Sequence, residues 1–246
     1  LHAALGAALV ERGQLAAGVA ALERSVQLDP ASGEARNNLA TALTEVNRTP
    51  EALSHFAAAL RLRPGVASTH YNFGNALLSV GRASEAIAQQ EQALVLLPDF
   101  SLARCALAQA QLAAGRVEPA IGNFHAALRH QPDLVAAHFG LANALAQAGR
   151  HAEAIPHYET ALRTAPNAVD AHYFLGNALL AVDRPADAVQ RYAAALELKP
   201  DFAEAHHYLG KALAQLGRTG EAIVHYETAL RLRPEFTASR SNLEAL

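Results

Sequence analysis

The chain has 246 residues, 51% of them hydrophobic, and a formal net charge of −3. Proteins that bind nucleic-acid phosphates or anionic lipid carry an excess of cations, so this charge argues against a nucleic-acid partner. No apolar run reaches the roughly 18 residues of a membrane span, so we expect no membrane insertion. Strong helix formers, alanine above all, outnumber β-branched residues, which predicts an all-α protein.

The single cysteine, Cys105, excludes an intrachain disulfide and leaves the compartment open. We expect a cytoplasmic protein. Because the sequence begins with Leu1 and not with methionine, we also expect it to be part of a longer protein.

Seven prolines recur at a constant spacing of 34 residues, which is the signature of a repeat protein. They are Pro30, Pro64, Pro98, Pro132, Pro166, Pro200 and Pro234. If each is numbered position 32 of its repeat, the chain divides into 1-32, 33-66, 67-100, 101-134, 135-168, 169-202 and 203-236, followed by a partial helix, 237-246. We expect these repeats to form one continuous domain, 1-246.

Each repeat predicts a helix A followed by a helix B. Helix A is expected over positions 2 to 14, because position 15 holds a residue that tolerates the left-handed turn conformation. These residues are Gly13, Asn47, Gly81, Gly115, Gly149, Asp183 and Gly217. Positions 8, 20 and 27 are small and position 24 is large, so the helices can pack closely around the position-24 side chain. In repeat 33-66 we expect Thr49 to cap helix B and Pro50 to be its first residue.

This 34-residue unit with its small/large/Pro pattern resembles the tetratricopeptide repeat (TPR). The resemblance covers the whole chain and implies a right-handed superhelical solenoid that binds other proteins. The chain departs from the family at position 4, where a large apolar residue is common and this sequence has His or Arg. We interpret the histidines there as substitutes for an aromatic packing residue.

In a TPR solenoid, positions 2, 5, 9 and 12 of helix A line the concave groove, on the helix side opposite the packing positions. From repeat 67-100 onward, position 5 is mostly aromatic and position 9 mostly a carboxamide, which both donates and accepts hydrogen bonds. These side chains, repeated along the groove, predict hydrogen bonds to the backbone of an extended peptide. The candidate residues are Tyr71, Asn75, Leu78, Gln109, Leu112, Phe139, Asn143, Tyr173, Asn177, Leu180, His207 and Lys211.

The recurring asparagine has a second interpretation. It could have been copied with the duplicated repeats and serve only to hydrate the groove or to hydrogen-bond a neighbouring helix. Under the peptide-binding interpretation, changing Asn143 and Asn177 to alanine should weaken binding with little loss of stability.

We expect no catalytic residue, cofactor or metal. Position 5 is never lysine, which argues against the carboxylate clamp of chaperone-binding TPR proteins. Histidines 34 residues apart lie on successive repeats, too far apart to share a metal ion. Cys105 is expected on the groove face without a base to activate it. The arginines at position 16 are expected to pair with nearby acidic groups; they are Arg48, Arg82, Arg116, Arg150, Arg184 and Arg218.

The function that we predict is a non-catalytic protein-protein interaction scaffold that binds a peptide segment of a partner. Two alternatives stay open. The segments "NNLATAL" and "HYNFGNAL" resemble repeats of the O-linked N-acetylglucosamine transferase family, which would make the chain the substrate-recruiting arm of a larger enzyme such as a peptide O-glycosyltransferase. Alternatively, the uncapped ends of the stack could pair between molecules in self-association.

Overall fold

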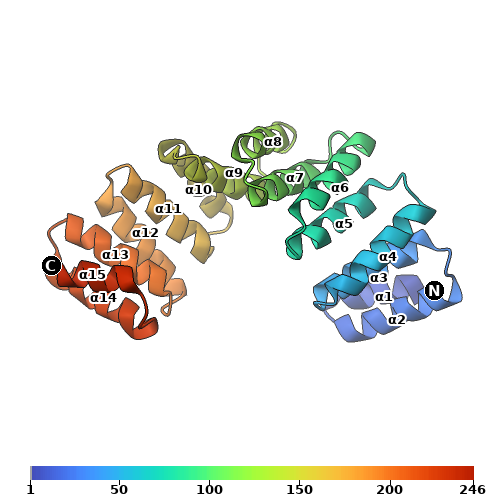
Figure 1. The fold of residues 1–246 in the computed structure, drawn as a ribbon, viewed down its shortest axis with the longest axis horizontal. Coiled ribbons are helices and arrows are strands. Elements are labelled where there is room, and N and C mark those ends of the chain that lie inside the picture. Colours follow the sequence, from blue (N-terminus) through green and yellow to red (C-terminus); the bar gives the residue numbers. More distant parts are fainter. Residues whose placement is uncertain (1) are drawn as a thin grey trace. The chain divides into compact units, whose positions relative to one another are not determined.

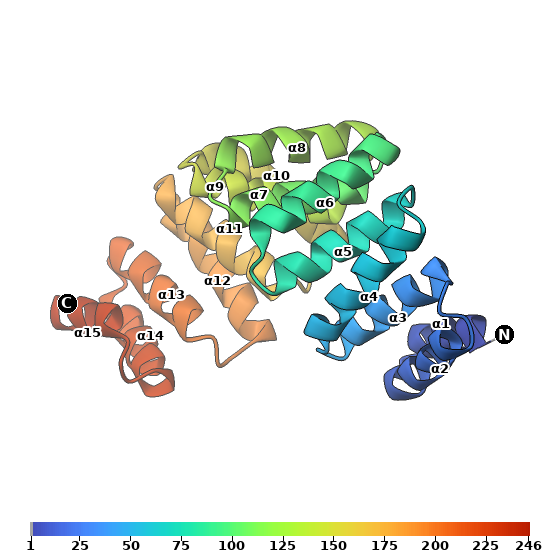
Figure 2. The same ribbon diagram turned by 45° about the vertical axis from the view of Figure 1, so that its right-hand side comes forward.

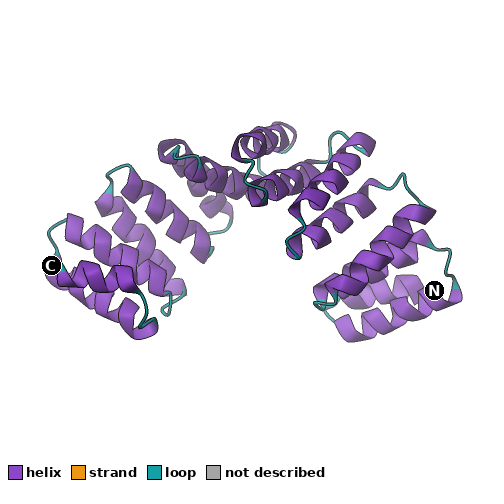
Figure 3. Cartoon of the chain, in the orientation of Figure 1, coloured by secondary structure: helices purple, strands orange, loops and turns teal. Residues whose placement is uncertain are grey.

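The computed structural model describes residues 2–246, which form fifteen α-helices joined by short loops, with no strand among them (Figures 1 and 3). Leu1, the first residue of the predicted repeat 1-32, lies outside the described residues. The expected all-α fold is confirmed.

The helices alternate between the two predicted types. Helices A are α1 (His2–Glu11), α3 (Gly33–Glu45), α5 (Ala67–Ser79), α7 (Ser101–Ala113), α9 (Val135–Gln147), α11 (Val169–Ala181), α13 (Ala203–Gln215) and α15 (Thr237–Glu244). Helices B are α2 (Leu15–Leu28), α4 (Thr49–Leu62), α6 (Ala83–Leu96), α8 (Val117–His130), α10 (His151–Thr164), α12 (Pro185–Leu198) and α14 (Thr219–Leu232). Full-length helices A cover positions 1 to 13, one residue earlier than expected.

The turn between helix A and helix B has the predicted conformation in every repeat. The position-15 residue always has a positive φ, including 61° at Asn47 and 58° at Asp183, where the residue is not glycine. This left-handed residue reverses the chain, so that helix B packs back on the helix A before it.

The expected cap at the start of α4 is wrong. The helix begins at Thr49, Pro50 is its second residue, and Arg48 holds the capping position without a side-chain cap. The Arg48 guanidinium instead donates two hydrogen bonds to Glu51, at 2.8 and 2.7 Å, while Thr49 is buried. The charge of Glu51 therefore compensates the positive helix end without a hydroxyl cap.

The expected local pairing of the position-16 arginines is confirmed in five repeats. Each of these arginines lies 2.6–2.7 Å from a carboxylate three residues later in the same helix turn. The pairs are Arg48–Glu51, Arg82–Glu85, Arg150–Glu153, Arg184–Asp187 and Arg218–Glu221.

Packing divides the chain into two compact units, Leu1–Pro132 and Asp133–Leu246. In each unit, neighbouring helices A contact one another, as α3 contacts α5 in the first unit and α11 contacts α9 and α13 in the second. Helices B contact mainly the helices A on either side of them; in the second unit α14 lies between α13 and α15 (Figure 2). Helices A therefore form the more closely packed, inner layer of each unit, and helices B form the outer layer.

The core of each repeat is the position-24 side chain between its two helices. Tyr158, Tyr192 and Phe124 have no exposed surface. Small residues opposite make room for them: a Cβ atom on Gly176 would lie 2.6 Å from the Tyr192 ring. Because the ring crosses the repeat from helix B to helix A, its far end reaches the position-9 side chain on the inner layer.

None of the helices in residues 2–246 combines the length and the apolar character that a membrane crossing requires.

Candidate functional site

The asparagine at position 9 is bound to the buried tyrosine at position 24 of its own repeat. The Tyr158 hydroxyl donates a hydrogen bond to Oδ1 of Asn143 at 2.6 Å, and the Tyr192 hydroxyl donates to Oδ1 of Asn177 at 2.7 Å. Burial raises the pKa of both tyrosines, so they are neutral donors. A buried hydroxyl without a partner destabilises a fold, and the asparagine oxygen supplies that partner.

The same contact takes another form in repeat 67-100. There, position 24 is Gln90, whose side-chain nitrogen donates to Oδ1 of Asn75 at 3.1 Å and to the Tyr71 carbonyl at 3.0 Å. Position 9 is thus asparagine in the three repeats in which a polar position-24 side chain reaches it.

Where position 24 is apolar or position 9 changes, the pairing changes too. Position 24 is Phe124 in repeat 101-134, and Gln109 at position 9 is exposed. In repeat 203-236 position 9 is Lys211, and the Tyr226 hydroxyl instead accepts a hydrogen bond from Nδ2 of Asn242 in the next helix A, at 3.3 Å. The asparagine therefore has a structural role, as the second interpretation of the sequence held.

The carboxamide nitrogens retain hydrogen-bonding capacity on the inner layer. Within residues 2–246, Nδ2 of Asn75 and Nδ2 of Asn143 have no protein acceptor. The Asn177 carboxamide differs, because it also lies beside Tyr173; burial raises the pKa of the Tyr173 hydroxyl, and the Asn177 carboxamide partly offsets that rise. Both asparagines without an acceptor are half-buried, so their nitrogens can meet a ligand.

The other predicted residues are distributed over both units. In the first unit, Tyr71, Leu78 and Leu112 are half-buried on the inner helices α5 and α7. In the second unit, Phe139, Tyr173 and Leu180 are half-buried on α9 and α11, and Lys211 is exposed on α13. These seven side chains thus lie on inner helices with surface left for a ligand.

Two side chains expected on the groove surface are buried instead. His207 is only 6% exposed and its Nδ1 lies 2.9 Å from the Ser239 hydroxyl, so it packs between α13 and α15. Cys105 is 4% exposed, and burial raises the pKa of its thiol to about 11, which keeps it protonated and unreactive at neutral pH.

Sequence reasoning missed two aromatic rings of the inner layer. Phe174 is 37% exposed, and Tyr208 lines an open cavity of about 270 Å³ with Asn177, Leu180 and Lys211. Both rings stand at position 6, which is not among the groove positions 2, 5, 9 and 12. The signal was a large aromatic residue that the packing positions do not require.

The histidines and arginines at position 4 share a polar contact, and two of the histidines, His138 and His206, also pack ring against ring with a helix-B histidine, at centroid distances of 5.2 and 5.3 Å. In at least six copies the side chain bonds the carbonyl oxygen of the landmark proline six residues earlier, as His70 Nε2 does at 3.0 Å to Pro64. The other five pairs are Arg36–Pro30, Arg104–Pro98, His172–Pro166, His206–Pro200 and Arg240–Pro234. Position 4 thus satisfies a loop carbonyl between repeats, which is why a polar side chain stands there.

Two repeats place histidines of helices A and B against each other. The Nδ1 atoms are 3.0 Å apart in His138–His157 and again in His206–His225. His206 Nε2 faces the Pro200 carbonyl and must carry a proton there, so the neutral pair needs His225 to donate from Nδ1. Residues 2–246 contain no group of three or more His, Cys, Asp or Glu side chains arranged to hold a metal ion.

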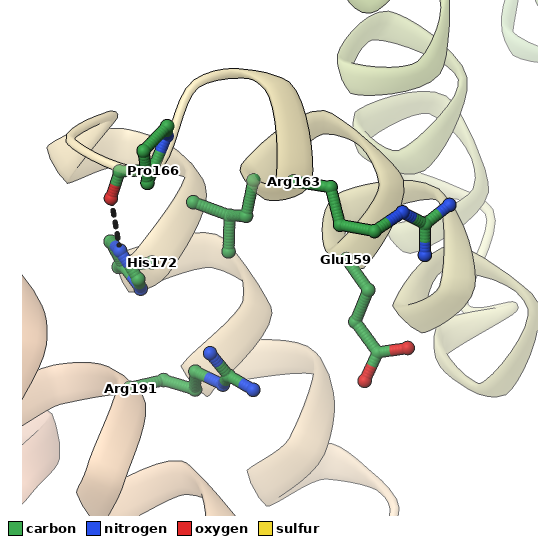
Figure 4. Close-up of a pocket in the computed structure, with 6 residues that line it drawn as sticks. Glu159, Arg163, Pro166, His172 and Arg191 are labelled. Carbon is green, nitrogen blue, oxygen red and sulfur yellow. Dashed lines mark hydrogen bonds between the residues drawn. The ribbon is translucent and has the colours of Figure 1, made fainter.

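An outer cavity of about 380 Å³ lies between α10 and the start of α11, with Arg191 of α12 on its far side (Figure 4). His172 lies there with Nε2 donating to the Pro166 carbonyl at 2.9 Å. Figure 4 shows the Arg163 guanidinium and the Glu159 carboxylate directed away from that ring. The charged groups therefore do not converge on one ligand position.

These features define a helical-repeat scaffold. The helix pairs have constant length, a left-handed residue follows each helix A, and small residues enclose the position-24 side chain. Tetratricopeptide repeat family models match residues 3–67, 38–101, 71–121, 105–169, 145–212 and 203–236. The chain belongs to the tetratricopeptide repeat family, whose fold supports protein–protein interaction. No curated protein matches it significantly.

Several solved structures share this fold. YrrB, described as a TPR protein with an unusual peptide-binding site, is 22% identical with a TM-score of 0.68, over 78% of this chain and 98% of that one. A tetratricopeptide repeat protein from Parabacteroides merdae is 15% identical with a TM-score of 0.70, over 99% and 96%. MamA from Desulfovibrio magneticus is 19% identical with a TM-score of 0.64, over 69% and 96%. At these identities the likeness establishes the fold alone.

Proposed function

We propose that the chain is a non-catalytic scaffold that binds an extended peptide segment of a partner protein on its inner helices. The second unit is the better equipped, because α9, α11 and α13 carry Phe139, Asn143, Tyr173, Asn177 and Lys211. Tyr71, Asn75, Leu78, Gln109 and Leu112 would offer a similar surface on α5 and α7 of the first unit.

The observation that carries this proposal is that only one end of the Asn143 carboxamide, its oxygen, is hydrogen-bonded within the protein. Its oxygen is committed to Tyr158, which fixes the side-chain orientation, and its nitrogen has no acceptor within residues 2–246. A donor fixed by an internal bond loses little conformational freedom when it binds a peptide carbonyl. The neighbouring aromatic rings add apolar contact.

Lys211, which lines the open cavity with Tyr208, supplies a positive charge to the site. Lys211 is exposed, stands beside Tyr208 and Gln215, and has no carboxylate within 4 Å among the described residues. A peptide with an acidic side chain near its aromatic or aliphatic residues would satisfy that cation. YrrB, which shares the fold, is itself described as having a peptide-binding site, which makes peptide the ligand class to test first.

The test uses Asn143→Asp, because a carboxylate still accepts the Tyr158 hydrogen bond but cannot donate to a peptide. Random peptides displayed on phage are selected on the wild type, and the affinities of the enriched peptides are measured for both proteins. We expect a loss of about tenfold, from one missing hydrogen bond and one unfavourable contact between the carboxylate and a peptide carbonyl. Gln190→Glu, the same change on an exposed outer helix, should bind as the wild type does.

Equal affinity of wild type and Asn143→Asp, with both folded, would contradict peptide binding through this carboxamide. Failure to enrich any peptide would contradict the function itself.

The two alternatives have their own tests. A recruiting arm would be followed in the parent gene by a catalytic domain, and the sequence beyond residue 246 shows whether one is present. Self-association through the stack ends would raise the mass measured by light scattering as the protein concentration rises.

A further inference from the structure

Four repeats carry a ring at position 5, and in three of them an aromatic ring at the last position of the repeat packs against it. The ring centroids are 5.1 Å apart in Tyr71–Phe100, 4.8 Å in Tyr173–Phe202 and 4.8 Å in His207–Phe236. Each phenylalanine stands at position 34, directly before the next helix A, so the pair closes the space between two successive inner helices at their starts.

Repeat 135-168 lacks this ring. Its position 5 is Phe139, but position 34 is Ala168 and the space beside Phe139 stays open. The result is a cavity of about 490 Å³, which is in the size range of ligand sites. We name it the alanine pocket; it is lined by Val135, Ala136, Phe139, Ala165, Ala168 and Asp170.

In the two following repeats, a cation also lies over the position-34 phenylalanine ring that repeat 135-168 lacks. The Lys199 nitrogen lies 5.0 Å from the Phe202 ring centroid, and the Arg233 guanidinium lies 5.3 Å from that of Phe236. Both cations stand at position 31, where repeat 135-168 has Ala165, which itself lines the alanine pocket. This repeat therefore lacks both the ring and its cation.

A carboxylate completes the arrangement. Glu204 stands two residues after Phe202, as Asp170 stands two residues after Ala168, and its Oε1 pairs with a cation of this kind, lying 2.6 Å from Nη2 of Arg233. The alanine pocket has an exposed acid on its rim, Asp170 in the first turn of α11, and no cation of residues 2–246 lies within 4 Å of it. The pocket thus presents an apolar floor with an unpaired negative charge at its edge.

We propose that the alanine pocket binds an aromatic side chain of the partner protein, next to a lysine or arginine that pairs with Asp170. The chain's own Phe202 with Lys199, and Phe236 with Arg233, show that this combination fits between successive inner helices. The inference rests on the proposed function in that the partner reaches the pocket as a peptide on these helices. It adds a specificity pocket that selects an aromatic residue with a basic neighbour.

The test measures binding of the capped dipeptide N-acetyl-Phe-Arg-amide by NMR of methyl-labelled protein. A ligand of this size should bind in the millimolar range, with saturable shifts of the Ala165, Ala168 and Val169 methyl signals. Ala168→Phe, which installs the ring found at Phe100, Phe202 and Phe236, should lower the affinity at least tenfold and raise the melting temperature. Ala152→Phe, the same change at an exposed outer position, should leave the affinity unchanged.

Three outcomes would overturn the pocket. One is equal binding by wild type, Ala168→Phe and the smaller filling variant Ala168→Leu. Another is equal affinity for N-acetyl-Ala-Arg-amide, which lacks the ring. The third concerns charge: the wild type should bind N-acetyl-Phe-Arg-amide more tightly than N-acetyl-Phe-Gln-amide, and an equal preference in Asp170→Asn would contradict the pairing with Asp170. If phage-selected peptides bind the inner helices but ignore Ala168→Phe, the pocket fails and the proposed function stands.

Discussion

At the scale of single residues, the position-9 asparagine is fixed by a buried tyrosine before any ligand arrives. The oxygen of Asn143 accepts from Tyr158 at 2.6 Å, so the side chain cannot be removed without leaving a buried hydroxyl unsatisfied. The expectation that alanine at Asn143 and Asn177 would leave stability almost unchanged is therefore withdrawn.

We predict that Asn143→Ala lowers the free energy of unfolding by about 1–3 kcal/mol, the usual cost of an unsatisfied buried donor. Urea denaturation of Asn143→Ala, Tyr158→Phe and the double variant would measure the coupling. The double variant should recover part of the loss, because no orphaned hydroxyl remains. Strictly additive losses would show that the two side chains do not interact.

Histidine burial makes stability depend on pH. Burial lowers the pKa of His55, His207 and His225, with the neighbouring His206 lowering that of His225 further and Glu221 opposing it. A lowered folded-state pKa means that the unfolded chain binds more protons in acid, so stability falls as pH drops. The loss should begin near the ordinary histidine value of about 6.5 and continue down to the lowered values.

We therefore predict a melting temperature that is constant above pH 7.5 and falls between pH 7 and 5.5. His225→Gln should make this fall smaller, because glutamine can bond His206 as Gln89 bonds His70, at 2.8 Å, without taking a proton. A scan of melting temperature against pH compares the two proteins. The same pH dependence in both would remove His225 from the explanation.

At the scale of the helix, the reversal after each helix A depends on one left-handed residue. Gly149 has a φ of 77° and no atom within 4 Å of the place where a Cβ would stand, so a substitution there changes backbone energy alone. Gly122, in the exposed middle of α8, also has open space around its Cβ position but an ordinary φ.

We predict opposite effects for the same substitution at these two glycines. Gly149→Ala should lower the free energy of unfolding by about 1–2 kcal/mol through left-handed strain. Gly122→Ala should raise it by about 0.5–1 kcal/mol, because alanine favours a helix. Chemical denaturation of both variants checks this, and changes of equal sign would contradict the assignment of Gly149 as the turn residue.

Periodicity predicted the helices well because their causes are local. A left-handed residue and a proline at fixed spacing mark the helix ends, and small residues mark the close contacts. Contacts between distant side chains were not predicted, because they depend on where two helices place their side chains relative to each other. The Asn143–Tyr158 bond is of this kind, and so is the burial of His207 under α15.

At the scale of the whole molecule, function depends on differences between repeats that share one architecture. The sequence alone does not distinguish Ala165 and Ala168 from the many other alanines of the chain. Their effect on the pocket follows from the structure, in which the equivalent residues Lys199 and Phe202 are in contact. One continuous domain over 1-246 stays a prediction, since packing defines the units Leu1–Pro132 and Asp133–Leu246 separately.

The most direct test of peptide binding by the inner helices is an NMR map of the protein saturated with a peptide selected on it. Backbone and carboxamide signals would be assigned for α9 to α14. We predict changes on α9, α11 and α13, with the Asn143 carboxamide among the largest, and little change on the exposed faces of α10, α12 and α14. Changes concentrated on those outer helices, with the Asn143 signal unmoved, would contradict it.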